Sequence, residues 1–62
     1  MHIFYIVVRL QKAGTVNIYD ASGRLVKTQK AIAGANTIDI NGLAPGTNFC
    51  EADGSRVQFM KL

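Results

Sequence analysis

Turn-forming residues divide this sequence into short β-prone segments, and this division limits the fold more than any other feature. Gly-containing turns separate runs of β-branched and aromatic residues at intervals typical of a sandwich. No window has the apolar period of an amphipathic helix. We therefore predict an all-β fold, a small Ig-like antiparallel β-sandwich of about six to seven strands. The expected strands are 2–10, 15–20, 24–30, 36–41, 47–53 and 55–61.

Two segments alternate apolar and polar residues, as a strand with one buried face does. In "TVNIYD", Val16 and Ile18 share one face, and in "NTIDI" the same holds for Ile38 and Ile40. We expect these four side chains to face the core. Leu43, in the connection "NGLAPG", is expected to fill the core from a loop.

Short polar residues, glycine and proline mark the turns. The residues expected to form them are Asp20, Gly23, Pro45, Asp53 and Gly54. Gly23 can take the positive φ that ends the loop "ASGR", and Pro45 with Gly46 fits a β-turn. Asp-Gly between two β-prone runs is the strongest hairpin signal in the chain.

A two-residue loop at 53–54 fixes the register of the last hairpin. The register places these residues opposite each other: Glu51 and Arg56, Cys50 and Val57, Asn48 and Phe59. Glu51 and Arg56 then form a cross-strand ion pair, which contributes less than about 1 kcal/mol at a surface.

The first apolar run, "IFYIVV", contains no charge, glycine or proline. We expect it to be central in a sheet or to be covered by another copy of the chain, and thus predict a homo-oligomer through residues 3–8. The run is far shorter than the roughly 20 residues of a membrane-spanning helix. It also lacks the features of a secretory signal, so the chain is expected to be cytoplasmic if Met1 is its natural start.

Length and charge restrict the partners. With 62 residues, we expect one domain, 1–62, with one small core. The net charge is +3, but no two of the seven Lys and Arg residues are adjacent. A nucleic-acid binder usually gathers its basic residues on one face. We therefore expect no nucleic-acid partner.

The sequence offers few groups for chemistry. Cys50 has no cysteine partner, and His2 is the only histidine, so neither a metal site nor a disulfide is expected. No third group is evident to orient His2 for a Cys-His nucleophile. The carboxylates lie in expected turns or on outward strand faces, and a small sandwich has little room for a pocket. We predict no catalytic residue, no cofactor and no small-molecule substrate.

Three segments, "IYDASGRLV", "NTIDINGLAPGT" and the final "RVQFMKL", occur here in a specific order and spacing. With them the chain resembles the type A C-terminal sorting domain of the type IX secretion system, found on secreted proteins of Bacteroidota. The resemblance covers residues 15–62. Residues 1–14 form an atypical N-terminal strand where the family has a Pro-Asn-Pro stretch. After "PGT" the family has large core residues where this chain has Asn48, Cys50 and Ala52.

The resemblance implies a non-enzymatic domain at the end of a cargo protein that is secreted or displayed on the cell surface. An outer-membrane translocon would recognise the domain, and a sortase-like peptidase would remove it. By position, the recognition residues that the resemblance implies are Gly46, Val57, Lys61 and Leu62. The alternative function is a generic Ig-like adhesion module that acts through strand pairing.

Overall fold

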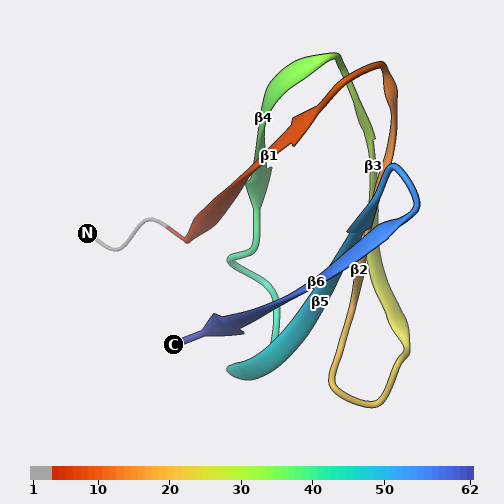
Figure 1. Ribbon diagram of the computed structural model, residues 1–62. Helices are drawn as coiled ribbons and strands as arrows, with labels where there is room; N and C mark the ends of the chain where they lie inside the picture. Colours follow the sequence, from red (N-terminus) through yellow and green to blue (C-terminus); the bar gives the residue numbers. More distant parts are fainter. Residues whose placement is uncertain (1–3) are drawn as a thin grey trace.

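The computed structural model describes residues 4–62 and forms two layers of antiparallel strands (Figure 1). The strands are β1 (Tyr5–Leu10), β2 (Gly14–Tyr19), β3 (Leu25–Ala31), β4 (Gly34–Asp39), β5 (Gly46–Ala52) and β6 (Ser55–Lys61). No helix occurs in this part of the chain, so the prediction of an all-β fold is confirmed. Each expected strand has an observed counterpart with small shifts at its ends. Residues 2 and 3 of the first expected strand lie outside the described residues.

The six strands form two sheets of unequal width. The larger sheet has the order β3-β2-β5-β6, and the smaller sheet pairs β1 with β4. The chain passes from one sheet to the other at three connections, β1–β2, β3–β4 and β4–β5. This sandwich-like arrangement agrees with the expected fold class.

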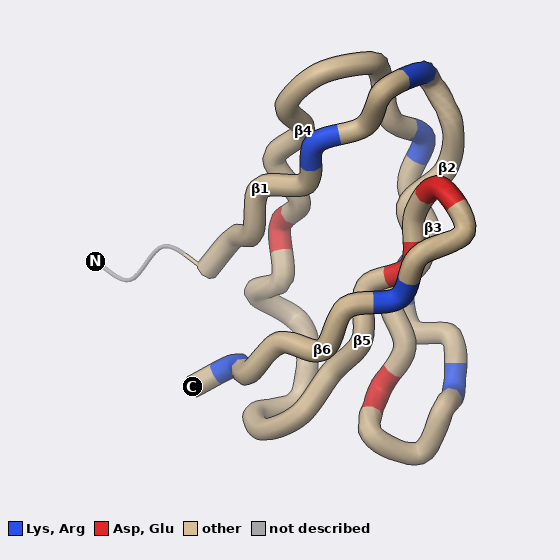
Figure 2. Tube along the Cα trace, viewed as in Figure 1, with Lys and Arg blue, Asp and Glu red and all other residues tan. Residues whose placement is uncertain are grey.

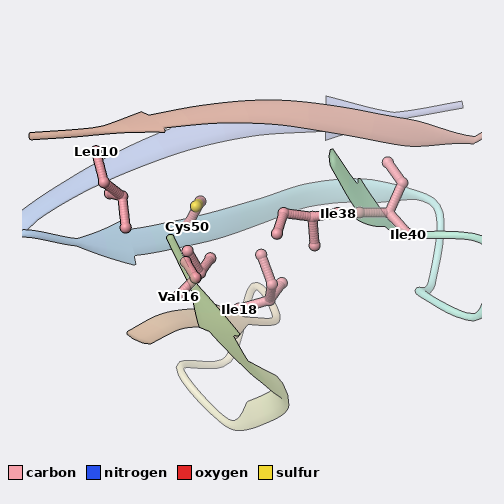
Figure 3. Close-up of a cluster of buried hydrophobic side chains, with 7 residues drawn as sticks. Leu10, Val16, Ile18, Ile38, Ile40 and Cys50 are labelled. Atoms are coloured by element: carbon pink, nitrogen blue, oxygen red, sulfur yellow. The ribbon is translucent and has the colours of Figure 1, made fainter. Parts of the chain in front are cut away.

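The core lies between the sheets and is small. Its buried apolar side chains are Leu10, Val16, Ile18, Ala31, Ile38, Ile40 and Cys50 (Figure 3). The inward positions predicted from the alternation of β2 and β4 are therefore confirmed. Leu43 packs against this cluster from the β4–β5 loop, also as predicted.

The prediction that the first apolar run is central in a sheet is wrong. In the described residues β1 pairs with β4 alone, and its burial alternates along the strand. Ile6 and Val8 face the core, whereas Tyr5 and Val7 remain 51% and 55% exposed. An apolar sequence therefore does not show whether one face of the strand is covered or both. Covering of the outer face by a second copy stays a prediction.

The connection between β4 and β5 turns earlier than expected. The hydrogen-bonded turn is closed by the Leu43 amide, which donates to the Ile40 carbonyl at 3.1 Å, so Asn41 and Gly42 are its central residues. Pro45 lies in a bend, and Gly46 is already the first residue of β5. The Asp39 carboxylate accepts from the Asn41 amide and favours this turn. The chain changes direction again at Pro45, and Gly46 has a φ of +105°, so the β-turn expected at these two residues stays a prediction.

Candidate functional site

The terminal hairpin, β5–β6, contains most of the expected recognition residues. Asp53 and Gly54 form its loop with φ angles of 52° and 75°, which are the two positive values that a type I′ turn needs. Gly54 takes its angle without the steric cost that a Cβ would add. The pairing of residue 51 with 56, 50 with 57 and 48 with 59 confirms the predicted register.

The outward face of this hairpin carries a cluster built around Arg56. Its guanidinium lies 3.6 Å from the Glu51 carboxylate and 4.6 Å from the centre of the Tyr19 ring. The Tyr19 hydroxyl donates to the same carboxylate at 3.3 Å. The predicted ion pair is thus present, and because both partners are partly exposed it contributes less than about 1 kcal/mol.

Lys61, at the end of β6, has a buried ammonium group rather than a solvated one. The residue is only 9% exposed, and its Nζ donates to the carbonyls of Asn41 at 3.1 Å and of Leu43. The ammonium also lies 5.3 Å from the centre of the Phe4 ring. These contacts connect the last strand to the β4–β5 loop and to the residue before β1.

Gly46 stands opposite Lys61 in the ladder and has a φ of +105°. A residue with a Cβ would be strained at this angle, so glycine sets the direction in which the chain enters β5. Next to it, the buried amide of Asn48 donates to the carbonyls of Ala44 and Gly46. Gly46 and Lys61 therefore share one hydrogen-bonded corner.

Val57 and Leu62 are the exposed members of the expected recognition set. Val57 is 62% exposed, and Leu62 follows β6 and is 95% exposed. Both side chains are therefore accessible to a partner. The structure thus separates the four residues into two that shape the hairpin, Gly46 and Lys61, and two whose side chains lie on the surface.

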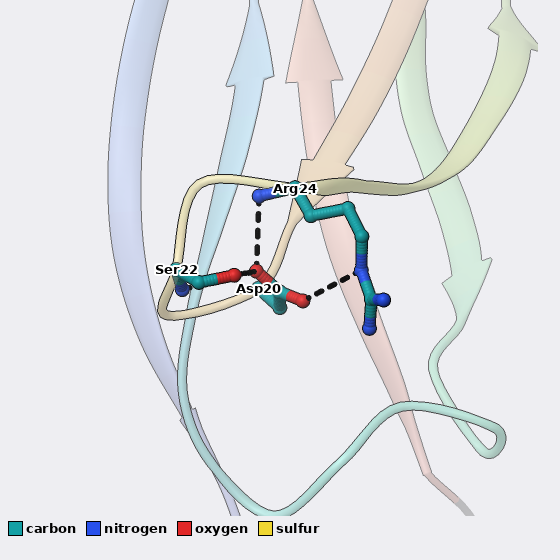
Figure 4. A network of polar contacts seen from close by, with 3 residues as sticks. All are labelled: Asp20, Ser22 and Arg24. Carbon is teal, nitrogen blue, oxygen red and sulfur yellow. Dashed lines mark hydrogen bonds and ion pairs between the residues drawn. The ribbon is translucent and has the colours of Figure 1, made fainter.

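Asp20 organises the turn between β2 and β3 (Figure 4). Its Oδ1 accepts bonds from the Ser22 hydroxyl at 2.6 Å and from the Arg24 amide at 3.0 Å, and its Oδ2 accepts from the Arg24 side chain. The Ser22 hydroxyl, the Arg24 amide and the Arg24 charge hold the pKa of the Asp20 carboxyl below its ordinary value. The predicted turn role of Asp20 is confirmed, as is the positive φ of Gly23, at 89°.

The family model for the secretion system C-terminal sorting domain matches residues 2–61, which is almost the whole chain. This chain belongs to that family. It is therefore a C-terminal sorting signal for type IX secretion, and the cargo that bears such a domain is exported to the surface or secreted. The family is not an enzyme family, and it gives no support to a cytoplasmic product. Neither the curated proteins nor the solved structures contain a significant match to the chain.

The match includes the segment that differed most from the expected pattern. Residues 1–14 were predicted to be atypical, yet the family model covers all of them except the first. In the structure β1 supplies Leu10 to the core and Ile6 and Val8 to its rim. The N-terminal strand is therefore an integral part of the sorting domain.

The structural role of two buried asparagines in the sorting domain was not predicted from the sequence. Asn48 stands where the family has a large core residue, and a buried amide without partners would destabilise the fold. Its Nδ2 group instead donates to the carbonyls of Ala44 and Gly46, and no buried side-chain polar atom in residues 4–62 lacks a hydrogen-bond partner. Asn36 likewise accepts from the Ile32 amide and donates to the Ile32 and Gly34 carbonyls. In both cases the asparagine comes two positions after a glycine that begins a strand, and this pattern could have indicated a hydrogen-bonded corner.

The described part of the sorting domain offers little for catalysis. Residues 4–62 hold no group of three or more His, Cys, Asp or Glu side chains that could bind a metal, and His2 lies outside them. Burial raises the pKa of the Cys50 thiol, which lowers its nucleophilicity at neutral pH. Basic residues are spread over the trace instead of gathering on one face (Figure 2). Within the same residues, no helix is long and apolar enough to cross a membrane.

Proposed function

We propose that the terminal hairpin of this sorting domain is read directly by the type IX outer-membrane translocon. A sortase-like peptidase then separates the domain from its cargo, which is anchored at the surface or released. The domain itself performs no catalysis. The family match over residues 2–61 carries this proposal.

The contacts of the hairpin support different roles for its four recognition residues. Val57 and Leu62 present apolar side chains that a translocon groove can bind. Gly46 and Lys61 keep the last strand in a fixed position, since the Lys61 ammonium is bonded to the β4–β5 loop. A fixed conformation lowers the entropy that binding has to overcome.

A reporter fusion tests the proposal. A periplasm-directed fluorescent protein is joined to the N-terminal end of this chain and expressed in a bacterium that has a type IX system. We expect the reporter to reach the cell surface, where added protease can digest it. Leu62→Asp should abolish export without changing the unfolding midpoint of the purified domain, because its side chain makes no buried contact.

Met60→Asp is the matched control for this experiment. Met60 lies on β6, two residues before Leu62, and is 64% exposed, and its side chain is on the opposite face of β6 from Val57 and Lys61. If export persists in Met60→Asp and is lost in Leu62→Asp, the result supports recognition of the last residue by the translocon. Equal export of both variants contradicts the proposal.

Strand pairing remains the rival function, favoured by the unpaired edges of β1 and β6 in the described residues. An adhesion module would leave the reporter in the periplasm, bound to a partner. Self-association through residues 3–8 is a related prediction, which the solution mass across a concentration series checks directly. A mass that stays monomeric at high concentration contradicts it.

A further inference from the structure

The smaller sheet is one strand too narrow to cover the larger one. Val57 lies opposite the buried Cys50 in the β5–β6 ladder, so its side chain points to the inner face of the sandwich. It is nevertheless 62% exposed, and Phe59 on the same face is only partly buried. Two inner-face apolar residues of β6 therefore lack the covering strand that the core residues of β2 have.

An apolar groove of about 400 Å³ occupies this uncovered position between β1 and β6. Its lining includes Ile6, Val8, Cys50, Val57 and Phe59. The two strands run in opposite directions along the groove (Figure 1). They approach each other at one end through Phe4 and Lys61, and at the other through Gln11 and Asp53. The groove is thus a gap of limited length between two fixed ends.

Backbone groups along the groove are also without ladder partners. In residues 4–62, β1 pairs only with β4, and β6 only with β5, so each has a second edge that joins no sheet. Neither edge contains a proline, one of the features that discourage pairing with another chain. An apolar floor beside an open strand edge is what an added strand requires.

We propose that this groove accepts one extended strand of a partner protein. The strand pairs with the free edge of β1 and lays alternate apolar side chains over Val57 and Phe59. This widens the smaller sheet to three strands. The proposal stands on the groove and the strand edges, and does not depend on the secretion role.

The charges beside the groove specify the partner further. Arg9 lines the groove and forms neither an ion pair nor a side-chain hydrogen bond with the described residues. It lies on the outward face of β1, where it can meet a carboxylate on the neighbouring strand. A second copy of the chain carries a net charge of +3. Its carboxylates are already engaged, Asp20 and Glu51 in ion pairs, Asp39 and Asp53 with backbone amides. The favoured occupant is therefore a different protein, with acidic residues on the outward face of its strand.

Two synthetic peptides test this inference on the full chain. Both alternate valine with a polar residue, which is glutamate in one peptide and lysine in the other. Backbone amide NMR signals of the chain are followed during titration with each peptide. We expect the glutamate peptide to shift the signals of β1 and β6, and to bind at least about threefold more tightly than the lysine peptide.

Charge reversal separates a specific contact from general attraction to a basic protein. Arg9→Glu should reverse the order of affinity of the two peptides. Lys30→Glu, at an exposed position of β3, should preserve that order, although both variants change the net charge equally. The inference is overturned if neither peptide binds, if both bind wild-type chain equally, or if the shifted signals lie on β3 and β4. It is also overturned if the chain alone sediments as a dimer whose Val57 and Phe59 signals change on dilution, because the occupant of the groove is then a second copy.

Discussion

Within residues 4–62, three polar side chains, Asn36, Asn48 and Lys61, are buried and bind backbone carbonyls at the corners where the chain changes direction. These carbonyls lie outside the regular ladders and would otherwise need water or remain unpaired. A core of seven buried apolar side chains cannot tolerate many unpaired groups. At the scale of single residues, hydrogen bonds to the backbone are therefore as necessary here as apolar packing.

Lys61→Met tests the role of the buried ammonium. Methionine keeps most of the aliphatic packing but leaves the Asn41 and Leu43 carbonyls without their donor. We expect the free energy of unfolding in urea to fall by about 1–3 kcal/mol. Lys30→Met, at an exposed position of β3, serves as the control and should change the free energy of unfolding by less than about 0.5 kcal/mol. Equal effects of the two changes would show that the ammonium contacts do not stabilise the fold.

The Asp20 turn predicts a pH dependence. Because its folded pKa lies below the value of 3.8 for the free side chain, the charged carboxylate stabilises the fold fully above that pH. This contribution is lost as the pH falls through the folded pKa. The difference in urea midpoint between wild type and Asp20→Asn should therefore shrink on acidification below about pH 4. A difference that stays constant with pH would exclude the carboxylate charge as its source.

The strands and turns of this chain differ in whether nearby residues or distant contacts determine their geometry. The β5–β6 hairpin is local, since two residues with positive φ set its twist and pair every residue from 46–52 with one from 55–61. The β1–β4 pair is not local, because more than twenty residues and two other strands separate its members. Its register depends on which apolar faces meet in the core.

Gly54→Ala tests the local control of the hairpin. The alanine Cβ meets no atom within 4 Å, so only the φ of +75° opposes the substitution. We expect a loss of about 1 kcal/mol in the free energy of unfolding. Gly42→Ala is the matched control, because Gly42 is also in a turn and also has open space but has no positive φ. A loss in the control as large as in Gly54→Ala would point to a cause other than backbone strain.

The whole molecule is a sandwich that is closed along one side and open along the other. On the β3–β4 side, the Lys27 ammonium donates to the Asp39 carbonyl and connects the sheets. On the β1–β6 side lies the apolar groove. Exposed apolar side chains occur on both sides, but on the open side Val57 is exposed although it points to the inner face of the sandwich. This asymmetry leaves one side of the domain available to a partner.

One substitution in the core and one on the open side check this asymmetry. Ile38→Val removes one methylene from a fully buried side chain and should cost about 0.5–1.5 kcal/mol. Val57→Ala removes two methyl groups from the open side and should cost less, because water already covers them. Urea unfolding of the two variants gives the comparison. If Val57→Ala proves the more destabilising change, the groove is filled in solution.

The sequence alone determined the elements whose causes lie within a few residues. Period-two alternation identified the inward side chains of β2 and β4, and Asp53-Gly54 set the hairpin register. The sequence could not place β1 in a sheet, identify the turn at Asn41 and Gly42, or show that Lys61 is buried. These features depend on contacts between segments distant in the chain. Only the tertiary structure brings the last strand against the β4–β5 loop, and only there does a terminal lysine find carbonyl partners away from water.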